Sequence, residues 1–417
     1  MFRERVEITT LGNGLRVVTE PMSSIRSIAM GVFVGVGARD ESAADSGLTH
    51  FIEHMLFKGT HRRTAREIAV AVESRGGMLN AFTDKEYTCY HARALAEDAP
   101  LVMDVISDML TQPLLADEEV ARERNVVLEE IRRYRDDPEE AVHDLLDSTM
   151  WPGHPLGRPV VGRSSTVKRF EAHRIRSFMD RYYEPSRIVV AAAGRIRHGA
   201  VVKLAERYFG AMPGRARRRP QVQPIPIAAE SFKRKRIEQV QFCLGIPTFG
   251  HRDPRRYTVA LIDMVLGGSM SSRLFQEIRE KRGLVYDIGS HIIGYRDTGL
   301  FAVSGGAGPA TFGQVLELIR QELQRIRKAG LEQDEIEQAK QRVRGVLVLS
   351  QESATARMMG VGKSLLLLDR VVPLDEVLAG IESVTNEMIR DVAGELFQPD
   401  RISLAAIGPL GREWAAA

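Results

Sequence analysis

Residues 46–60 read SGLTHFIEHMLFKGT, and the five letters at their centre, HFIEH, occupy residues 50–54. Two histidines, His50 and His54, therefore stand four residues apart. On an α-helix, residues at this spacing share one face and lie about one turn from each other. Their imidazoles can bind one Zn²⁺ between them. Glu53 follows on nearly the same face, where it can act as general base on a metal-bound water.

The order of these residues, H-x-x-E-H, is that of an inverted zinc-hydrolase helix. Histidine and glutamate are unusual on a buried helix unless they are paired or bind a ligand, whereas on an exposed helix they are ordinary residues. The neighbours favour the buried case because most of them are apolar: Leu48, Phe51, Ile52, Met55, Leu56 and Phe57. The motif thus predicts a metal site on a mostly apolar helix whose surroundings look buried.

Composition bounds the class of protein. The chain has 417 residues, of which 44% are hydrophobic and 27% charged, so it is expected to fold as an ordinary globular protein of two or three domains. The longest apolar stretches fall short of the roughly 18 residues that a membrane-spanning helix needs. The first residues, MFRERVE, contain no signal-peptide core, and their acidic members argue against a transit peptide. We therefore expect a cytoplasmic protein, or one already processed.

Cysteine and charge exclude two further classes. Cys89 and Cys243 are too few for a disulfide framework, and neither has a ligand-spaced neighbour, so both are predicted to be small core residues. A net charge of +3 does not indicate a nucleic-acid partner. The basic run Arg215–Arg219 precedes several prolines, which favours a solvated linker over a nucleic-acid site.

The chain repeats itself. A Pro- and Arg-rich stretch, residues 213–226, divides it almost in half, and each half has a strand, a helix, a strand pair and a helix of period 3.6. The ranges are 27–36, 50–57, 78–92 and 99–110 in the first half and 239–246, 256–266, 283–305 and 312–326 in the second. This order predicts an α+β fold of two homologous domains, each an antiparallel-rich sheet packed with helices. We place the domains at 1–212 and 233–417, joined by a linker at 213–232.

Only the first repeat carries the motif. When residues 55–59 are laid on residues 264–268, Val259, Ile262 and Asp263 fall where His50, Glu53 and His54 stand. The second half therefore keeps the scaffold but lacks the ligands. A site present in one copy of a duplicated fold is better explained by chemistry than by packing.

A catalytic zinc needs a third protein ligand and keeps its fourth position for water. The predicted helix at 118–135 offers Glu123, Glu129 and Glu130. Glu123 and Glu130 are seven residues apart and share a face, whereas Glu129 points about 100° away. Two apolar residues lie between them on the predicted inward side: Val126 and Val127. This favours Glu130 as the ligand and Glu123 as a supporting carboxylate, and it leaves Glu129 open.

The stretch 46–60 and the segment RERNVVLEE at 122–130 resemble the pitrilysin family of zinc peptidases, which includes insulin-degrading enzyme and mitochondrial processing peptidase. The resemblance covers almost the whole chain. It implies a zinc endopeptidase with one Zn²⁺ per chain, Glu130 as third ligand and Glu123 as the supporting acid. Glu53 would be the general base. Mn²⁺ or Co²⁺ can replace zinc in such a site in vitro.

The same resemblance extends to substrate contacts. GGMLNAFT at 76–83 looks like the edge strand on which the family binds its peptide, which implies substrate contacts for Asn80, Ala81 and Phe82. The second half contains GGSMSSRLFQEIREKRGLVY at 267–286, which resembles the family's C-terminal signature. There an Arg and a Tyr contact the substrate carbonyl or oxyanion, and here they are Arg279 and Tyr286.

Chain length then bears on assembly. Family members are either double-length chains of four domains or half-length chains that pair, and this chain resembles the half-length class. The resemblance therefore implies a dimer enclosing a chamber, most simply a homodimer, in which Arg279 and Tyr286 serve the partner's zinc site. Two alternatives stay open: a subunit that needs a zinc-free sister chain, and a structural assembly subunit without activity. No membrane or nucleic-acid partner is expected.

Overall fold

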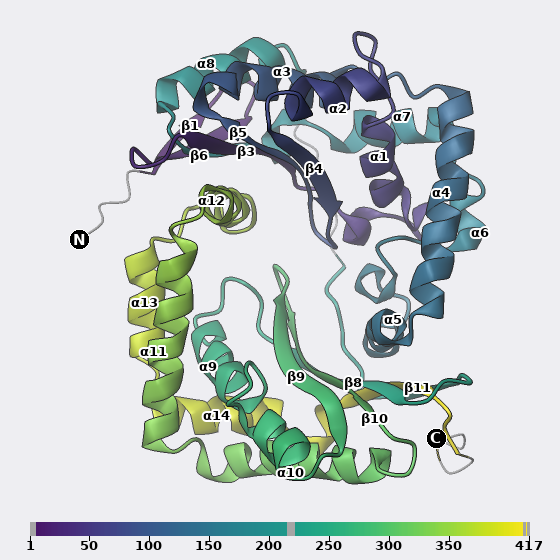
Figure 1. Cartoon of the computed structure of the whole chain (residues 1–417), viewed down its shortest axis with the longest axis vertical. Helices are drawn as coiled ribbons and strands as arrows, with labels where there is room; N and C mark the ends of the chain where they lie inside the picture. Colours follow the sequence, from purple (N-terminus) through teal and green to yellow (C-terminus); the bar gives the residue numbers. More distant parts are fainter. Residues whose placement is uncertain (1–5, 215–221, 412–413, 415–417) are drawn as a thin grey trace. The chain divides into compact units, whose positions relative to one another are not determined.

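The computed structural model describes residues 6–214, 222–411 and 414 (Figure 1). The chain forms two compact units that are discontinuous in sequence. Unit 1 comprises Met1–Ile131, Pro159–Gln221 and Val348–Pro373, and unit 2 comprises Arg132–Arg158, Val222–Leu347 and Leu374–Ala417. The boundaries expected at 212 and 233 follow the repeats along the chain, whereas the units also exchange two segments between those repeats. The basic run at 215–219 lies outside the described residues.

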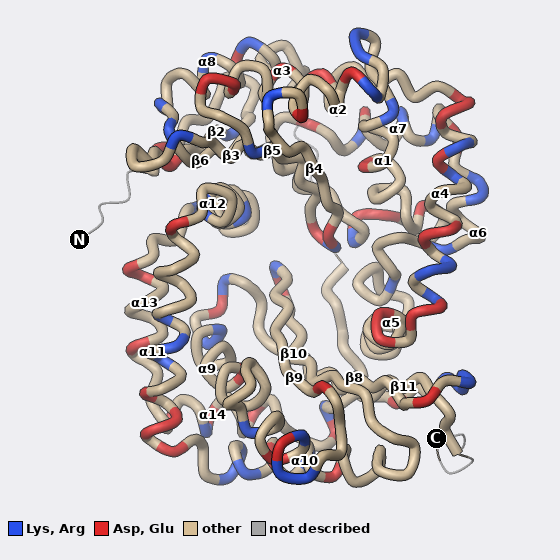
Figure 2. Tube along the Cα trace, in the orientation of Figure 1, with Lys and Arg blue, Asp and Glu red and all other residues tan. Residues whose placement is uncertain are grey.

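Unit 1 is built on a six-stranded sheet in the order β1-β2-β6-β3-β5-β4. Only β2 and β6 run parallel, and the other neighbours are antiparallel. The strands are β1 Glu7–Thr10, β2 Arg16–Pro21, β3 Ser27–Val34, β4 Met78–Thr83, β5 Thr88–Leu95 and β6 Ile188–Gly194. The central strands β3 and β6 contain no charged residue (Figure 2), which suits strands that are buried on both faces.

Helices cover both faces of this sheet. One face packs in a large core against α1, α3 and α8, and the opposite face packs against α12 (Figure 1). The helices of unit 1 are α1 Leu48–Leu56, α2 Ala65–Glu73, α3 Ala99–Thr111, α6 Ser164–Val167, α7 Ala172–Tyr182, α8 His198–Phe209 and α12 Ala354–Leu368. Helix α4, Asp117–Asp136, begins in unit 1 and leaves it after Ile131.

Unit 2 repeats the plan with five strands in the order β7-β11-β8-β10-β9. Strands β7 and β11 run parallel and the other neighbours antiparallel. The strands are β7 Glu230–Arg234, β8 Val240–Thr248, β9 Val285–Gly294, β10 Gly299–Ala307 and β11 Ser403–Gly408. The helices are α5 Pro138–Met150, α9 Arg256–Leu266, α10 Phe312–Ala329, α11 Gln333–Ser350, α13 Leu374–Glu382 and α14 Asn386–Leu396, with a π-helix at Phe275–Glu280.

The two sheets correspond strand for strand from β2-β6-β3-β5-β4 to β7-β11-β8-β10-β9. The α+β prediction with two homologous repeats is therefore confirmed. The sequence did not predict how each sheet covers its second face. Helix α12, from the second half of the chain, packs on the sheet of unit 1, and α5, from the first half, packs on the sheet of unit 2. Each repeat needs a helix from the other to bury that apolar face.

Three smaller expectations can be compared with the structure. Cys89 and Cys243 are free and buried, as predicted. The inward placement of Val126 is wrong: its side chain is 50% exposed, whereas Val127 is fully buried, because the buried stripe of α4 runs through Glu123, Val127 and Ile131. No helix among the described residues is long and apolar enough to cross a membrane.

Candidate zinc site

Helix α1 carries the motif, and its first turn is fixed by a buried carboxylate from outside the helix. Glu41 accepts hydrogen bonds from the backbone N–H groups of Gly47 and Thr49, each at 2.7 Å, and from the Thr49 hydroxyl at 2.6 Å. An acidic group at this end also complements the helix dipole. Gly47 has φ +93°, and a Cβ there would lie 2.7 Å from Gly162 Cα. Glycine is therefore required where the chain enters the helix.

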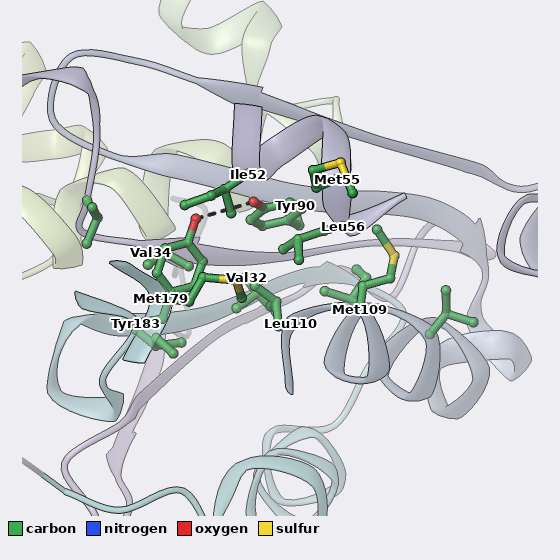
Figure 3. Close-up of a cluster of buried hydrophobic side chains, with 14 of the residues drawn as sticks. Val32, Val34, Ile52, Met55, Leu56, Tyr90, Met109, Leu110, Met179 and Tyr183 are labelled. Atoms are coloured by element: carbon green, nitrogen blue, oxygen red, sulfur yellow. Dashed lines mark hydrogen bonds between the residues drawn. The ribbon is translucent and has the colours of Figure 1, made fainter. Parts of the chain in front are cut away.

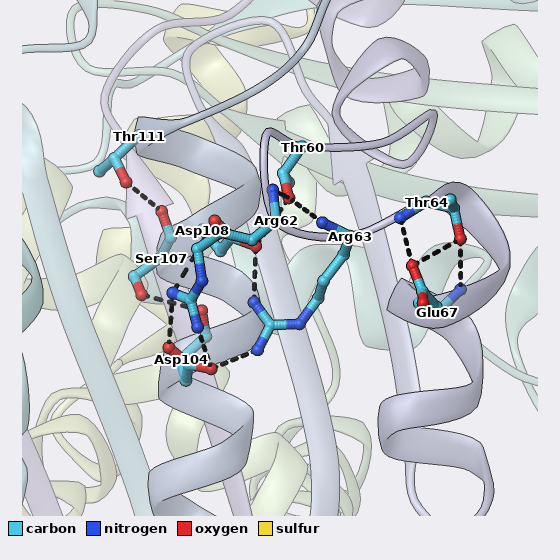
Figure 4. Close-up of polar contacts among 9 residues, drawn as sticks. All are labelled: Thr60, Arg62, Arg63, Thr64, Glu67, Asp104, Ser107, Asp108 and Thr111. Carbon is cyan, nitrogen blue, oxygen red and sulfur yellow. Dashed lines mark hydrogen bonds and ion pairs between the residues drawn. The ribbon is translucent and has the colours of Figure 1, made fainter.

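The loop after α1 is fixed to α3 (Figure 4). Thr60 donates to Asp108 at 2.8 Å, and Arg62 forms two hydrogen bonds of 3.0 Å with Asp104. Arg63 pairs with both aspartates and is 2.6 Å from Asp108. Paired, bidentate contacts of this kind define geometry better than single ones. The helix is thus held at both ends, which restricts how its histidines can shift.

The apolar face of α1 packs into the core of unit 1. Ile52, Met55 and Leu56 are buried and belong to the same core cluster as Tyr90 and Tyr183 (Figure 3). The two phenol hydroxyls are 3.5 Å apart. Because this face is occupied by packing, the opposite face of the helix presents His50, Glu53 and His54.

His50, His54 and Glu130 converge on one point. Glu130 Oε2 lies 3.7 Å from His50 Nε2 and 3.6 Å from His54 Nε2. These three residues form the one group among the described residues whose ligand atoms are close enough to share a metal ion. The structure therefore brings together two helices, α1 and α4, that are more than 60 residues apart in the chain.

The donor set fits zinc. Tetrahedral zinc with bonds of about 2.0–2.2 Å places its ligand atoms roughly 3.4 Å apart, close to the separations seen here. Glu130 Oε2 is buried and has no hydrogen-bond partner among the described residues, although it faces two ring nitrogens. A buried carboxylate oxygen without a partner is costly unless a cation neutralises it. Two imidazoles and one carboxylate also match the ligand set of several catalytic zinc sites.

The pKa values of the two histidines are shifted in opposite directions. Burial, followed by the proximity of His54, lowers the pKa of His50 to about 3, so its ring is neutral, as a metal ligand must be. Burial acts to lower the pKa of His54 too, but the hydrogen bond to Glu123 and the charge of Glu130 outweigh it and raise that pKa.

Glu123 orients His54. Its Oε1 lies 2.8 Å from His54 Nδ1, and its Oε2 lies 2.7 Å from the ammonium group of Lys58. Burial alone would raise the pKa of Glu123, but the hydrogen bonds from His54 and Lys58 outweigh it and lower the pKa. An ionised Glu123 holds the Nδ1–H of His54 and directs Nε2 toward Glu130. The sequence motifs did not predict this contact of Lys58, although Lys58 stands four residues after His54 within residues 46–60.

Glu53 points from α1 toward the edge of the sheet. Its Oε2 accepts a hydrogen bond of 2.6 Å from the hydroxyl of Thr83, the last residue of β4. Burial raises the pKa of Glu53, and the Thr83 hydrogen bond partly offsets this. A carboxylate with a raised pKa is suited to accept a proton near neutral pH. The sequence motifs indicated no role for Thr83, although it ends the segment 76–83.

The structure separates the two adjacent glutamates of α4. Glu129 is exposed, whereas Glu130 is half-buried and faces the histidines. The helical period indicated this difference but did not exclude Glu129.

The three residues expected to contact substrate lie on β4, which is an edge strand of its sheet. Asn80 is exposed, and its side-chain oxygen accepts a 2.8 Å hydrogen bond from the backbone N–H of Ala81. Phe82 contacts the rings of Tyr87 and His91. Among the described residues β4 thus pairs with another strand on one side only, and its role in binding a peptide stays a prediction.

Arg279 and Tyr286 belong to unit 2 and lie together there. The guanidinium of Arg279, in the π-helix, is 5.5 Å from the centre of the Tyr286 ring and 4.5 Å from that of Phe275. Tyr286 is 77% exposed, so it is not a core tyrosine. In the same unit, α9 carries Asp263, which accepts a hydrogen bond of 2.6 Å from Ser290.

Two family models match this chain. The family model described as insulinase, peptidase family M16, matches residues 16–164, and the model described as the peptidase M16 inactive domain matches residues 169–343. The chain belongs to peptidase family M16. The model that covers α9, the helix without metal ligands, is the one described as inactive.

Relatives within family M16 match along nearly their full length. An uncharacterised zinc protease of Streptomyces coelicolor is 44% identical over 97% of this chain and 90% of its own. The uncharacterised zinc protease YmxG of Bacillus subtilis is 38% identical over 96% and 98%. The chain therefore spans nearly the whole length of these relatives.

Solved structures share the fold. A protease from Helicobacter pylori superposes with a TM-score of 0.90 at 22% identity, covering 97% of this chain and all of the other. A peptidase M16 inactive domain from Pseudomonas fluorescens gives a TM-score of 0.91 at 19% identity, covering 98% and 99%. The resemblance noted in the sequence is thus confirmed at the level of family and fold.

Proposed function

We propose that this chain is a zinc-dependent endopeptidase. The observation that supports the proposal most strongly is the convergence of His50, His54 and Glu130, with Glu53 on the same helix face. The relatives named zinc proteases agree with it.

In this proposal His50, His54 and Glu130 hold one Zn²⁺ per chain. When bound, zinc supplies Lewis-acid polarisation of the scissile carbonyl and makes water more acidic. Glu53 accepts the proton from the attacking water and later delivers it to the leaving amine. Glu123, supported by Lys58, keeps the imidazole of His54 oriented throughout.

The substrate in this proposal is a peptide or an extended protein segment. The open edge of β4 can add such a segment as a further strand, with main-chain hydrogen bonds supplying affinity that depends little on side chains. Asn80, Ala81 and Phe82 would lie along that segment. A dimer enclosing a chamber would exclude folded proteins from the site.

Metal removal tests the function. Purified protein is expected to contain zinc, to cleave a mixed peptide library, and to lose cleavage after dialysis against a chelator because the attacking water and the carbonyl are no longer activated. Stoichiometric zinc is expected to restore it. Cleavage that survives complete removal of metal would contradict the proposal, and zinc-loaded protein that cleaves no peptide, alone or with added partners, would favour a structural assembly subunit.

Complementation tests the proposed homodimer, in which Arg279 and Tyr286 act on the partner's zinc site. Glu53→Gln and Tyr286→Phe homodimers are each expected to be nearly inactive. The two variants are then co-expressed with different tags. Random pairing makes half of the dimers heterodimers, and each heterodimer has one intact site of two. About a quarter of wild-type activity should therefore return. Activity equal only to the sum of the two separate variants would show that the residues do not act in trans.

A further inference from the structure

The contact between Glu53 and Thr83 joins the proposed general base to the edge strand. Thr83 Oγ1 donates to Glu53 Oε2 at 2.6 Å, a short distance typical of a hydroxyl bound to a carboxylate. Thr83 is the last residue of β4, the strand proposed to bind substrate. The family resemblance assigned roles to Asn80, Ala81 and Phe82 but none to Thr83.

The sheet fixes the position of this hydroxyl. Thr83 pairs across the strands with Thr88 of β5, and their hydroxyl oxygens are 3.4 Å apart. Thr88 is fully buried and its hydroxyl donates to the carbonyl of Val36 at 3.0 Å. The backbone N–H of Asp84 donates to the carbonyl of Tyr87 at 2.8 Å and closes the turn between the strands. Thr83 is thus held by the β4–β5 pair.

The direction of the hydrogen bond follows from counting protons. A hydroxyl has one hydrogen, and Thr88 uses its own for Val36. Thr83 has two neighbouring acceptors, the carboxylate of Glu53 at 2.6 Å and the hydroxyl of Thr88 at 3.4 Å. Its single hydrogen goes to Glu53, which is the closer of the two. One lone pair of Oε2 of Glu53 is then engaged by Thr83, whereas Oε1 receives no hydrogen bond from Thr83.

We propose that Thr83 is a positioning residue for Glu53: it holds one carboxylate oxygen so that the other faces the attacking water, and it makes the orientation of the base depend on the strand that receives the peptide. The proposal rests on the proposed function. It assigns Thr83 an effect on the rate of reaction after the substrate binds and no effect on metal binding.

Two substitutions and one control test it in the zinc-loaded protein. Thr83→Val removes the hydroxyl and keeps the shape, whereas Thr83→Ser keeps the hydroxyl and removes the methyl group. Thr111→Val is the control, because Thr111 ends α3 and its hydroxyl donates to the carbonyl of Ser107 within the same helix. We expect Thr83→Val to lower kcat by about 10- to 100-fold, since a misplaced catalytic group costs up to that much, with KM changed by less than about twofold. Zinc content should stay that of the wild type.

Thr83→Ser is expected to recover most of kcat, and Thr111→Val to match the wild type. If Thr83→Val keeps its kcat, raises only KM, or loses zinc, Thr83 is not a positioning residue for the base. A crystal structure of zinc-loaded Thr83→Val separates this proposal from the proposed function, even if the wild type cleaves nothing. A Glu53 carboxylate that turns away or occupies several rotamers supports the role of Thr83, and one that keeps its wild-type position overturns it.

Discussion

Glu53→Gln is expected to bind zinc like the wild type and to lose about 10²- to 10⁴-fold in kcat, the contribution typical of a general base. Glutamine preserves the size of the side chain and can still accept the hydrogen bond from Thr83. It cannot take a proton from the attacking water. The measurement is the rate of cleavage of a fluorescent peptide at saturating concentration, with bound metal quantified in the same preparation.

Asp263→Asn provides the matched control. Asp263 is a half-buried acid on α9, the helix of unit 2 that corresponds to α1, and burial raises its pKa. The amide oxygen can still accept from Ser290, so this variant should cleave at the wild-type rate. A Glu53→Gln protein that retained more than about a tenth of wild-type kcat would rule out Glu53 as the base.

Glu130→Gln is expected to lose zinc, and with it all cleavage. The carboxylate supplies the only negative charge among the three proposed ligands, and a neutral amide is a poor zinc ligand. The loss of zinc affinity should exceed the roughly 10- to 100-fold that changes around metal ligands usually cause. It is measured by dialysing the protein against graded chelator and quantifying the zinc that remains.

Glu129→Gln makes the same chemical change one position earlier on the same helix. Because Glu129 is exposed and is not one of the three residues whose ligand atoms converge, this variant should retain full zinc content and activity. The reverse outcome, in which Glu129→Gln loses zinc and Glu130→Gln keeps it, would show that α4 presents its other carboxylate to the metal and that the proposed ligand set is wrong.

The sequence alone was sufficient for features that depend on neighbours along the chain. The spacing of His50 and His54 places them on one helix face, because the helical period is a local property. Alternating and 3.6-residue patterns likewise predicted the paired sheets and the repeat. The missing ligands at Val259, Ile262 and Asp263 were visible from the repeat by itself.

Features that depend on contacts between distant segments required the folded structure. The period of α4 did not show that Val126 faces solvent, because the side a helix buries is set by what packs against it. The contacts of Lys58 with Glu123 and of Thr83 with Glu53 join separate elements and leave no periodic signal. The exchange of α5 and α12 between the repeats likewise depends on contacts between segments that are distant in the chain. Local pattern thus determined the helix that carries the motif, whereas tertiary packing determined which side chains complete and orient its site.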